Sequence, residues 1–394
     1  MLITAGTMLR GPVGDRVEDA AVLVRGGTIV AAGPRTEVEH LAGPGTPRHD
    51  HPGATLLPGL INGHVHFCFD ASDDPVGAML REDETRLPER ARDLLTAGVT
   101  TVRDLGDLKG RALRLRNAVE AGAVPGPRIL AAGTPLTPPG GHCWFFGGEV
   151  AGERAMRDLV RRNADAGAAV IKVMASGGHI TAGGASMWES QFTTAELAAV
   201  VDEADRFGLP VAAHAHGTES IVRSITAGVS TVEHCTWLDA TGTPERRDDV
   251  ARTMAERGIA ACCTTCGRDW RGSVERLGEQ AARELYGRLV WMRELGVPLL
   301  PGTDGGVHDA VFDDYAGMLE LYEWLGFPAA EVIELATTSA ARLLGLAGVT
   351  GRIEPGLDAD LIVVGGDPSA ELAHLHDIRM VVARGRVAGR PVRT

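Results

Sequence analysis

An apolar run ends in two closely spaced histidines in the segment Leu57-Pro58-Gly59-Leu60-Ile61-Asn62-Gly63-His64-Val65-His66. In a β-strand, residues two positions apart project from the same face, so His64 and His66 could offer two imidazoles to one metal ion. Two ordinary polar residues at a strand end would give the same pattern without a metal. The metal interpretation gains weight because further candidate ligands follow at the ends of later apolar runs.

The middle of the chain alternates between apolar runs typical of buried β-strands and segments with helical spacing. The strand-like runs are Gly59–Val65, Val99–Asp104, Arg128–Ala132, Ala169–Ala175, Val211–His216, Ser230–Cys235, Ile259–Thr265 and Val297–Thr303. The helical segments include Glu153–Ala166, Thr194–Phe207 and Ser273–Leu295, and residues 192–196 are typical of an N-cap region. Strands that alternate with helices predict a (β/α)8 barrel, whose catalytic groups lie at the C-terminal strand ends.

The two ends of the chain carry a different pattern of short strand-like runs. Near the N-terminus, residues 20–24 and 28–32 flank Gly26-Gly27, which predicts a hairpin. Near the C-terminus, residues 360–364 and 380–383 repeat the pattern. We therefore expect the two ends to pair into one small β-domain that closes around the middle of the chain.

Composition limits the classes of function. The chain has 394 residues, 44% of them hydrophobic, and 39 basic against 52 acidic side chains give a net charge of −13. This acidity argues against nucleic acid or an anionic membrane as a partner. Neither a transmembrane run nor a signal-peptide pattern is apparent, and six irregularly spaced cysteines predict buried, reduced thiols. We expect a cytoplasmic homo-oligomer that acts on small molecules.

Lys172 lies inside the apolar run Val170-Ile171-Lys172-Val173-Met174-Ala175. A lysine in such a strand is costly unless its charge is removed or paired. It could be a Schiff-base nucleophile with a lowered pKa, a structural lysine paired to a carboxylate, or an amine carbamylated by CO₂ that bridges two cations. The neighbouring histidines favour the bridging role.

Three later apolar runs end in further candidate ligands. His214 and His216 form a second pair two residues apart, and His234 ends the next run. Asp304 follows the last run, where it could bind a metal and accept a proton from metal-bound water. Imidazole and carboxylate ligands suit Zn²⁺, and Mn²⁺ or Co²⁺ would also fit.

This ordered set resembles the amidohydrolase superfamily of metal-dependent hydrolases, and most closely its prolidase, or Xaa-Pro dipeptidase, branch, whose relatives include imidazolonepropionase. The set comprises His64, His66, Lys172, His214, His234 and Asp304, on strands one, four, five, six and eight. The resemblance implies an α/β fold with a TIM barrel over residues 56–349. It also implies that residues 1–55 and 350–394 form a small composite β-sandwich.

The resemblance further implies a site with two divalent ions, most simply Zn²⁺. One ion would be held by His64, His66 and Asp304, the second by His214 and His234, and Lys172, carboxylated on its terminal nitrogen, would bridge them. A hydroxide shared by the ions would attack a C–N amide bond. Asp304 would carry the proton of this hydroxide to the leaving nitrogen, so Asp304 and Lys172 are the catalytic candidates.

Several substrates fit this chemistry. The leading prediction is a dipeptide or an N-acyl amino acid, and the first alternative is a cyclic amide such as an imidazolone, a hydantoin or a lactam. A deaminase with one metal is a further alternative, because residues 216–219 have a His-x-x-Glu spacing, although Lys172 argues against it. A scaffold without activity is disfavoured because the ligand set is complete.

Four residues are candidates for binding the substrate. His142 follows the third strand and resembles a histidine that faces the substrate in the same branch; it could equally be a solvated loop residue. His216 could contact the substrate or could replace His214 as the ligand. Trp144 could form part of an apolar rim or simply pack a loop, and Arg268 could bind a substrate carboxylate or be solvated.

Overall fold

The computed structural model describes residues 1–81 and 84–388 of a mixed α/β protein. Its strands form three sheets. The seven-stranded sheet has the order β14 (Arg386–Ala388), β13 (Ile378–Ala383), β12 (Leu361–Gly365), β4 (Arg48–Pro58), β1 (Leu2–Leu9), β2 (Arg16–Arg25), β3 (Thr28–Pro34). The three-stranded sheet contains β5 (Leu60–Val65), β6 (Val99–Asp104) and β7 (Arg128–Ala131). The four-stranded sheet contains β8 (Ile171–Met174), β9 (Val211–Gly217), β10 (Thr231–Leu238) and β11 (Ala260–Cys262).

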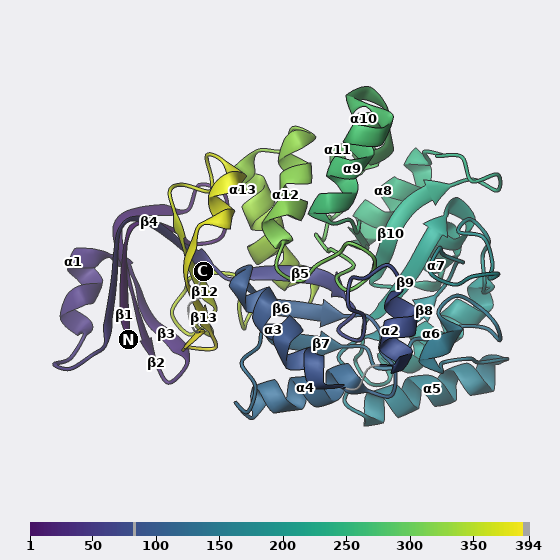
Figure 1. Ribbon diagram of the computed structural model, residues 1–394, viewed down its shortest axis with the longest axis horizontal. Helices are drawn as coiled ribbons and strands as arrows, with labels where there is room; N and C mark the ends of the chain where they lie inside the picture. Colours follow the sequence, from purple (N-terminus) through teal and green to yellow (C-terminus); the bar gives the residue numbers. More distant parts are fainter. Residues whose placement is uncertain (82–83, 389–394) are drawn as a thin grey trace.

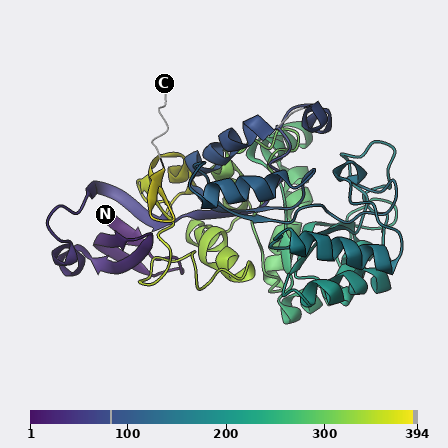
Figure 2. The same cartoon turned by 90° about the horizontal axis from the view of Figure 1, so that it is seen from below.

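The seven-stranded sheet unites the two ends of the chain. β12 pairs with β4 in antiparallel register from Leu361 opposite Pro58 to Gly365 opposite Ala54. β4 in turn pairs with β1 in parallel. Figures 1 and 2 show the N-terminal strands and the C-terminal strands together at one end of the molecule. The chain therefore leaves this sheet through β4 and returns to it only at β12.

The two smaller sheets are parallel throughout and occupy the other end of the molecule (Figure 1). Isolated parallel bridges relate them: Leu136 with Val173, Ala261 with Leu299, and Val65 with Gly305. The predicted strand Val297–Thr303 makes only such bridges. Pro298 and Pro301 explain the difference, because neither residue has a backbone N–H to donate to a ladder.

Helices follow most of the parallel strands. They are α2 (Pro75–Arg81), α3 (Leu87–Thr96), α4 (Arg111–Glu120), α5 (Glu153–Asp165), α6 (Thr194–Asp205), α7 (Thr218–Ala227), α8 (Asp248–Arg257), α9 (Gly267–Leu277), α10 (Glu279–Tyr286), α11 (Arg288–Glu294), α12 (Tyr315–Trp324), α13 (Ala329–Glu334) and α14 (Ala340–Leu343). The single helix α1 (Arg35–Val38) belongs to the N-terminal segment, and short 3-10 or π turns occupy Glu39–Leu41, Glu84–Arg86, Trp144–Phe146, Leu335–Ser339 and Leu372–His376.

Two of the helices show how well local sequence signals work. α6 begins with a capping box, in which the Thr193 side chain accepts from the Glu196 backbone and Glu196 accepts from the Thr193 backbone, as the N-cap pattern predicts. The predicted helical segment Ser273–Leu295, by contrast, is divided into three helices. The breaks fall at Gly278, whose φ is +81°, and at Gly287.

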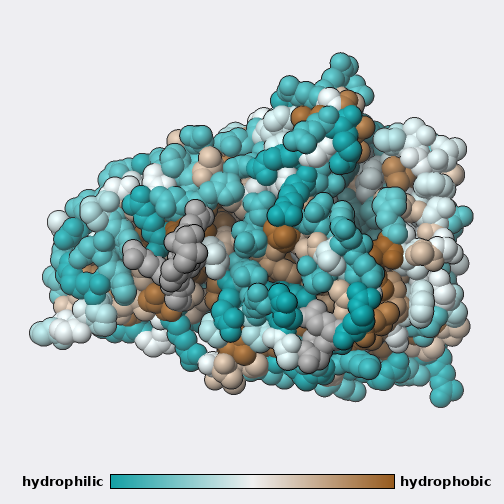
Figure 3. All heavy atoms as spheres, in the orientation of Figure 1, coloured by the Kyte–Doolittle hydropathy of each residue, from teal (hydrophilic) through white to brown (hydrophobic). Residues whose placement is uncertain are grey.

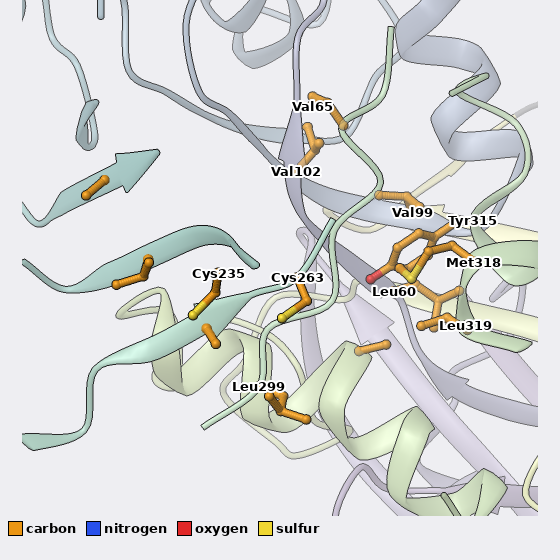
Figure 4. Packing of buried hydrophobic residues seen from close by; sticks show 14 of the residues in the cluster. Leu60, Val65, Val99, Val102, Cys235, Cys263, Leu299, Tyr315, Met318 and Leu319 are labelled. Atoms are coloured by element: carbon orange, nitrogen blue, oxygen red, sulfur yellow. The ribbon is translucent and has the colours of Figure 1, made fainter. Parts of the chain in front are cut away.

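One large apolar cluster joins the parallel strands to the surrounding helices. Figure 4 shows part of it, where Leu60 on β5 lies beside Tyr315 and Met318 of α12. The six cysteines are all buried and unpaired, as expected. The face seen in Figure 3 is mainly hydrophilic, with small apolar patches. Among the described residues, every helix is too short or too polar to cross a membrane.

Candidate metal centre

His64, His66 and Asp304 form the first group of candidate ligands. His64 lies on β5, His66 directly follows that strand, and Asp304 follows the bridging segment at residues 299–302. His64 Nε2 lies 3.3 Å from His66 Nε2 and 3.2 Å from Asp304 Oδ1, and the third side of this triangle is 3.4 Å. The structure thus brings together three atoms from two distant parts of the chain.

The donor atoms of this triangle fit a metal ion. A tetrahedral ion with ligand bonds of about 2.0–2.2 Å separates its ligand atoms by about 3.3–3.6 Å. Asp304 Oδ1 is also buried without a hydrogen-bond partner among the described residues. A buried carboxylate oxygen left in this state is costly, and a cation between the three atoms would remove the cost.

The Nδ1 atoms of His64 and His66 face groups that can only accept a hydrogen bond. His64 Nδ1 lies 2.8 Å from Glu233 Oε2, and His66 Nδ1 lies 2.9 Å from the carbonyl oxygen of Gly106. Both rings therefore carry their proton on Nδ1 and turn an Nε2 lone pair toward the triangle. This arrangement presents both imidazoles in the tautomer that a metal requires.

Glu233 lies in this centre, although it was not among the residues predicted for the site. It is fully buried, and its other oxygen accepts from Arg103 at 2.8 Å and from Thr231 at 2.5 Å. Arg103 also donates to the Gly63 carbonyl at 2.8 Å, so the pair anchors the strand that carries His64. A carboxylate inside an apolar strand was the available signal, because a buried charge requires a partner.

His214, His216 and His234 form a second group, whose candidate ligand atoms all lie within 4.8 Å of one another. His214 Nε2 donates to the carbonyl oxygen of Gly177 at 3.0 Å, which leaves its Nδ1 lone pair free to bind a metal. His216 Nδ1 and His234 Nδ1 lie next to hydroxyl groups, Thr236 Oγ1 at 2.8 Å and Thr264 Oγ1 at 2.6 Å. The geometry alone fixes a lone pair only for His214.

Lys172 lies on β8 with its side chain buried. Burial lowers its pKa, while the charges of Glu233 and Asp304 oppose this shift. The charge of Lys172 in turn lowers the pKa of His64 on the first group and of His214 and His234 on the second. Lys172 therefore lies within electrostatic reach of both groups.

Three imidazoles of the centre, those of His64, His214 and His234, are neutral at neutral pH. For His66, burial would lower the pKa, but the hydrogen bond and the charge of Asp304 raise it above the ordinary value. Burial, followed by the charge of Lys172, lowers the pKa of His64 to about 4. Burial also lowers the pKa of His214 and His234 well below the ordinary value. For Asp304, burial alone would raise the pKa, but His64, His66 and Lys172 hold it below the usual range. Neutral imidazoles and an ionised carboxylate are the forms that bind divalent ions.

Backbone strain marks the same two strand ends. His234 has φ of +64° and Asp304 has φ of +58°, in the left-handed region that side chains other than glycine rarely adopt. Such strained residues concentrate at functional sites because the surrounding structure must hold them in place.

The structure places the predicted substrate-binding residues in different surroundings. His142 is buried against His214, with ring centroids 4.5 Å apart. His216 is half-buried beside His214 and His234. Trp144 is 48% exposed next to Phe145. Arg268 is exposed on α9 and lies 3.7 Å from Asp309, so it already has a carboxylate partner.

Comparison with known proteins shows the family to which the chain belongs. A family model described as the amidohydrolase family matches residues 55–388, so the protein belongs to that family. An ochratoxinase from Aspergillus niger is 28% identical over 418 aligned residues, covering 94% of this chain and 82% of the relative. A 5-methylthioadenosine/S-adenosylhomocysteine deaminase from Symbiobacterium thermophilum is 27% identical, covering 100% and 91%.

A solved structure of a Xaa-Pro dipeptidase with methionine in its active site is also similar. It superposes with a TM-score of 0.84 at 27% identity and covers 98% of both chains. These findings confirm the predicted family and the predicted class of enzyme, a hydrolase that acts on carbon–nitrogen bonds.

Proposed function

We propose that this protein is a binuclear metal-dependent hydrolase that cleaves the amide bond of a dipeptide or an N-acyl amino acid. The observation that carries the proposal is the position of buried Lys172 within electrostatic reach of two groups of candidate metal ligands. Similarity to a Xaa-Pro dipeptidase and to an ochratoxinase supports this choice of bond.

The ligand assignment follows the resemblance to the family, and the lone pairs of His64, His66 and His214 support it. His64, His66 and Asp304 would hold one divalent ion, most simply Zn²⁺, and His214 and His234 would hold the second. Lys172 would bridge them after its neutral amine adds CO₂ and releases a proton to become a carbamate. Burial favours that neutral amine. His216 would then face the substrate.

Bound divalent ions would act as Lewis acids and lower the pKa of the attacking water. Asp304 has a side chain 23% exposed, so its second oxygen can accept the proton of this water and deliver it to the leaving nitrogen. His142, packed against His214, would contact the amide carbonyl. Trp144 would line the entrance, where its exposed ring could contact an apolar substrate group. For Arg268, a role in binding a substrate carboxylate would require release from Asp309.

We also infer that the two parallel sheets and the bridges between them are one (β/α)8 barrel over residues 56–349. Residues 1–55 and 350–394 would then form the composite β-sandwich domain, although residues 389–394 lie outside the described residues. Homo-oligomerisation and a cytoplasmic location stay predictions, and the first can be checked by sedimentation.

A second candidate is a deaminase, favoured by the relative from Symbiobacterium. It would need one ion and no carbamate. Metal analysis of protein produced with zinc and bicarbonate separates the two candidates. About two ions per chain, lost together with amide hydrolysis in Lys172→Ala, would support the proposal. One ion and full turnover in Lys172→Ala would overturn it. A panel of dipeptides, N-acyl amino acids, cyclic amides and aminopurines then identifies the bond cleaved.

A further inference from the structure

Thr181 lies in the loop after β8 and contacts His142 directly. Its side chain is 7% exposed. The backbone N–H of Cys143 donates to Thr181 Oγ1 at 2.8 Å, and the same oxygen lies 3.0 Å from His142 Nδ1. The hydroxyl therefore has two neighbours within hydrogen-bond distance, and both belong to the loop that carries His142.

The chemistry of these neighbours fixes the direction of the bond to His142. A backbone N–H can only donate, so Cys143 cannot take the proton of the hydroxyl. Among the contacts of the described residues, His142 Nδ1 is then the acceptor available to Thr181. A buried hydroxyl that found no acceptor would lose a hydrogen bond that it makes in water. Thr181 therefore donates to Nδ1, and the neutral ring carries its proton on Nε2.

This tautomer is opposite to that of the first histidine pair. His64 and His66 donate from Nδ1 to a carboxylate and a carbonyl oxygen, so each presents a lone pair at Nε2. His142 presents an N–H at Nε2 instead. A ring in this state cannot bind a metal through Nε2, but it can donate a hydrogen bond there.

The position of the ring does not depend on Thr181 alone. Gln191 accepts from the His142 backbone at 2.8 Å, and Thr137 donates to the His142 carbonyl at 2.7 Å. A Cβ atom at Gly178 would lie 2.5 Å from the ring, so glycine at this position lets the imidazole pack closely. The backbone and the packing hold the ring in place, and the Thr181 hydroxyl determines which ring nitrogen carries the proton.

We propose that Thr181 is a positioning residue that keeps the proton of His142 on Nε2, from which the ring donates a hydrogen bond to the carbonyl oxygen of the scissile amide. The role of the donor rests on the proposed amide hydrolysis, whereas the position of the proton does not. Negative charge develops on that oxygen during attack, and a prepared donor stabilises it more in the transition state than in the bound substrate.

The kinetic test uses Thr181→Val, which keeps the shape and removes the hydroxyl, and Thr181→Ser, which keeps the hydroxyl. We expect kcat to fall roughly 100-fold in Thr181→Val with little change in KM. Thr181→Ser should retain most of the native kcat. In a His142→Ala background, Thr181→Val should have no further effect. Equal losses in the Val and Ser variants, or additive losses with His142→Ala, would overturn the proposal.

The second arm reads the proton directly and needs no turnover. Nitrogen-15 spectra of histidine-labelled protein, with His142→Gln to assign the ring, distinguish protonated from unprotonated ring nitrogens. We expect the His142 proton on Nε2 in the native protein and redistributed in Thr181→Val. Thr350→Val is the matched control, a buried threonine in the segment before β12, and should leave the His142 signals unchanged. A native proton on Nδ1 would overturn the proposal. If the spectra agree but no amide is cleaved, the proposed function fails and the assignment of the proton stands.

Discussion

Two His-x-His pairs with identical spacing lie at the C-terminal ends of β5 and β9, yet their surroundings differ. In the first pair, a carboxylate and a carbonyl oxygen accept from both Nδ1 atoms, and the two Nε2 atoms lie 3.3 Å apart. In the second pair, His214 donates from Nε2 instead, and His216 faces a hydroxyl group. The spacing brings imidazoles together, but the partner of the opposite nitrogen decides which of them can bind a metal.

The largest effect is expected when the first group of candidate ligands loses Asp304. Asp304→Asn removes a negative ligand and the proposed proton carrier, so we expect kcat to fall at least about 1000-fold. Bound metal should also decrease, as measured by elemental analysis. His308→Asn, an exposed change in the following loop, is the control for general damage. Activity within tenfold of the native enzyme would show that Asp304 is not the proton carrier.

The second pair can be divided by single substitutions. His214→Asn should release about one ion per chain and lower kcat roughly 100-fold, because it removes the lone pair that the Gly177 carbonyl fixes. His216→Asn should keep both ions and chiefly raise KM. Isothermal titration of the metal-free proteins with zinc measures how many ions each variant binds. The reverse result would make His216 the ligand and change the comparison.

Glu233→Gln tests the support of the first pair. An amide can donate to His64, so the ring is no longer required to carry its proton on Nδ1, and we expect metal affinity to fall about 10- to 100-fold. Arg103 also loses its buried counter-charge, which should lower the free energy of unfolding by about 3–5 kcal/mol. Competition with a zinc chelator and urea unfolding give the two numbers. Unchanged affinity together with reduced stability would leave Glu233 a purely structural role.

The smallest effect is expected in Thr264→Val. This change removes the hydroxyl 2.6 Å from His234 Nδ1 and should lower the affinity for the second ion by about tenfold. Thr264→Ser keeps the hydroxyl and should bind normally. If both variants bind zinc as the native protein does, the second group does not depend on this contact, and the contrast with Glu233 becomes sharper.

Local and chemical signals in the sequence predicted more than tertiary ones. The bounds of α5 and the cap of α6 depend on neighbouring residues and were predictable. His64, His66 and Asp304 were candidates because each ends an apolar run, and the resemblance to the amidohydrolases grouped them. The structure brings their ligand atoms within 3.4 Å of one another. By contrast, the pairing of Glu233 with His64 joins residues 169 positions apart, and no local pattern encodes it. The exposed position of Arg268 likewise depends on the path of α9 after Cys266.

The pairing of β4 with β12 can form only late in the synthesis of the chain. Thr55 and Gly366 hydrogen-bond across 311 residues, so β4 pairs early with β1 but waits for its other neighbour until almost the whole chain has been made. At about 5–20 residues per second, that wait lasts roughly 15–60 s. During this time a strand edge with unpaired backbone groups is open to other chains on the same ribosome cluster. Slower translation or a missing C-terminal segment should therefore appear first as aggregation, before any defect in catalysis.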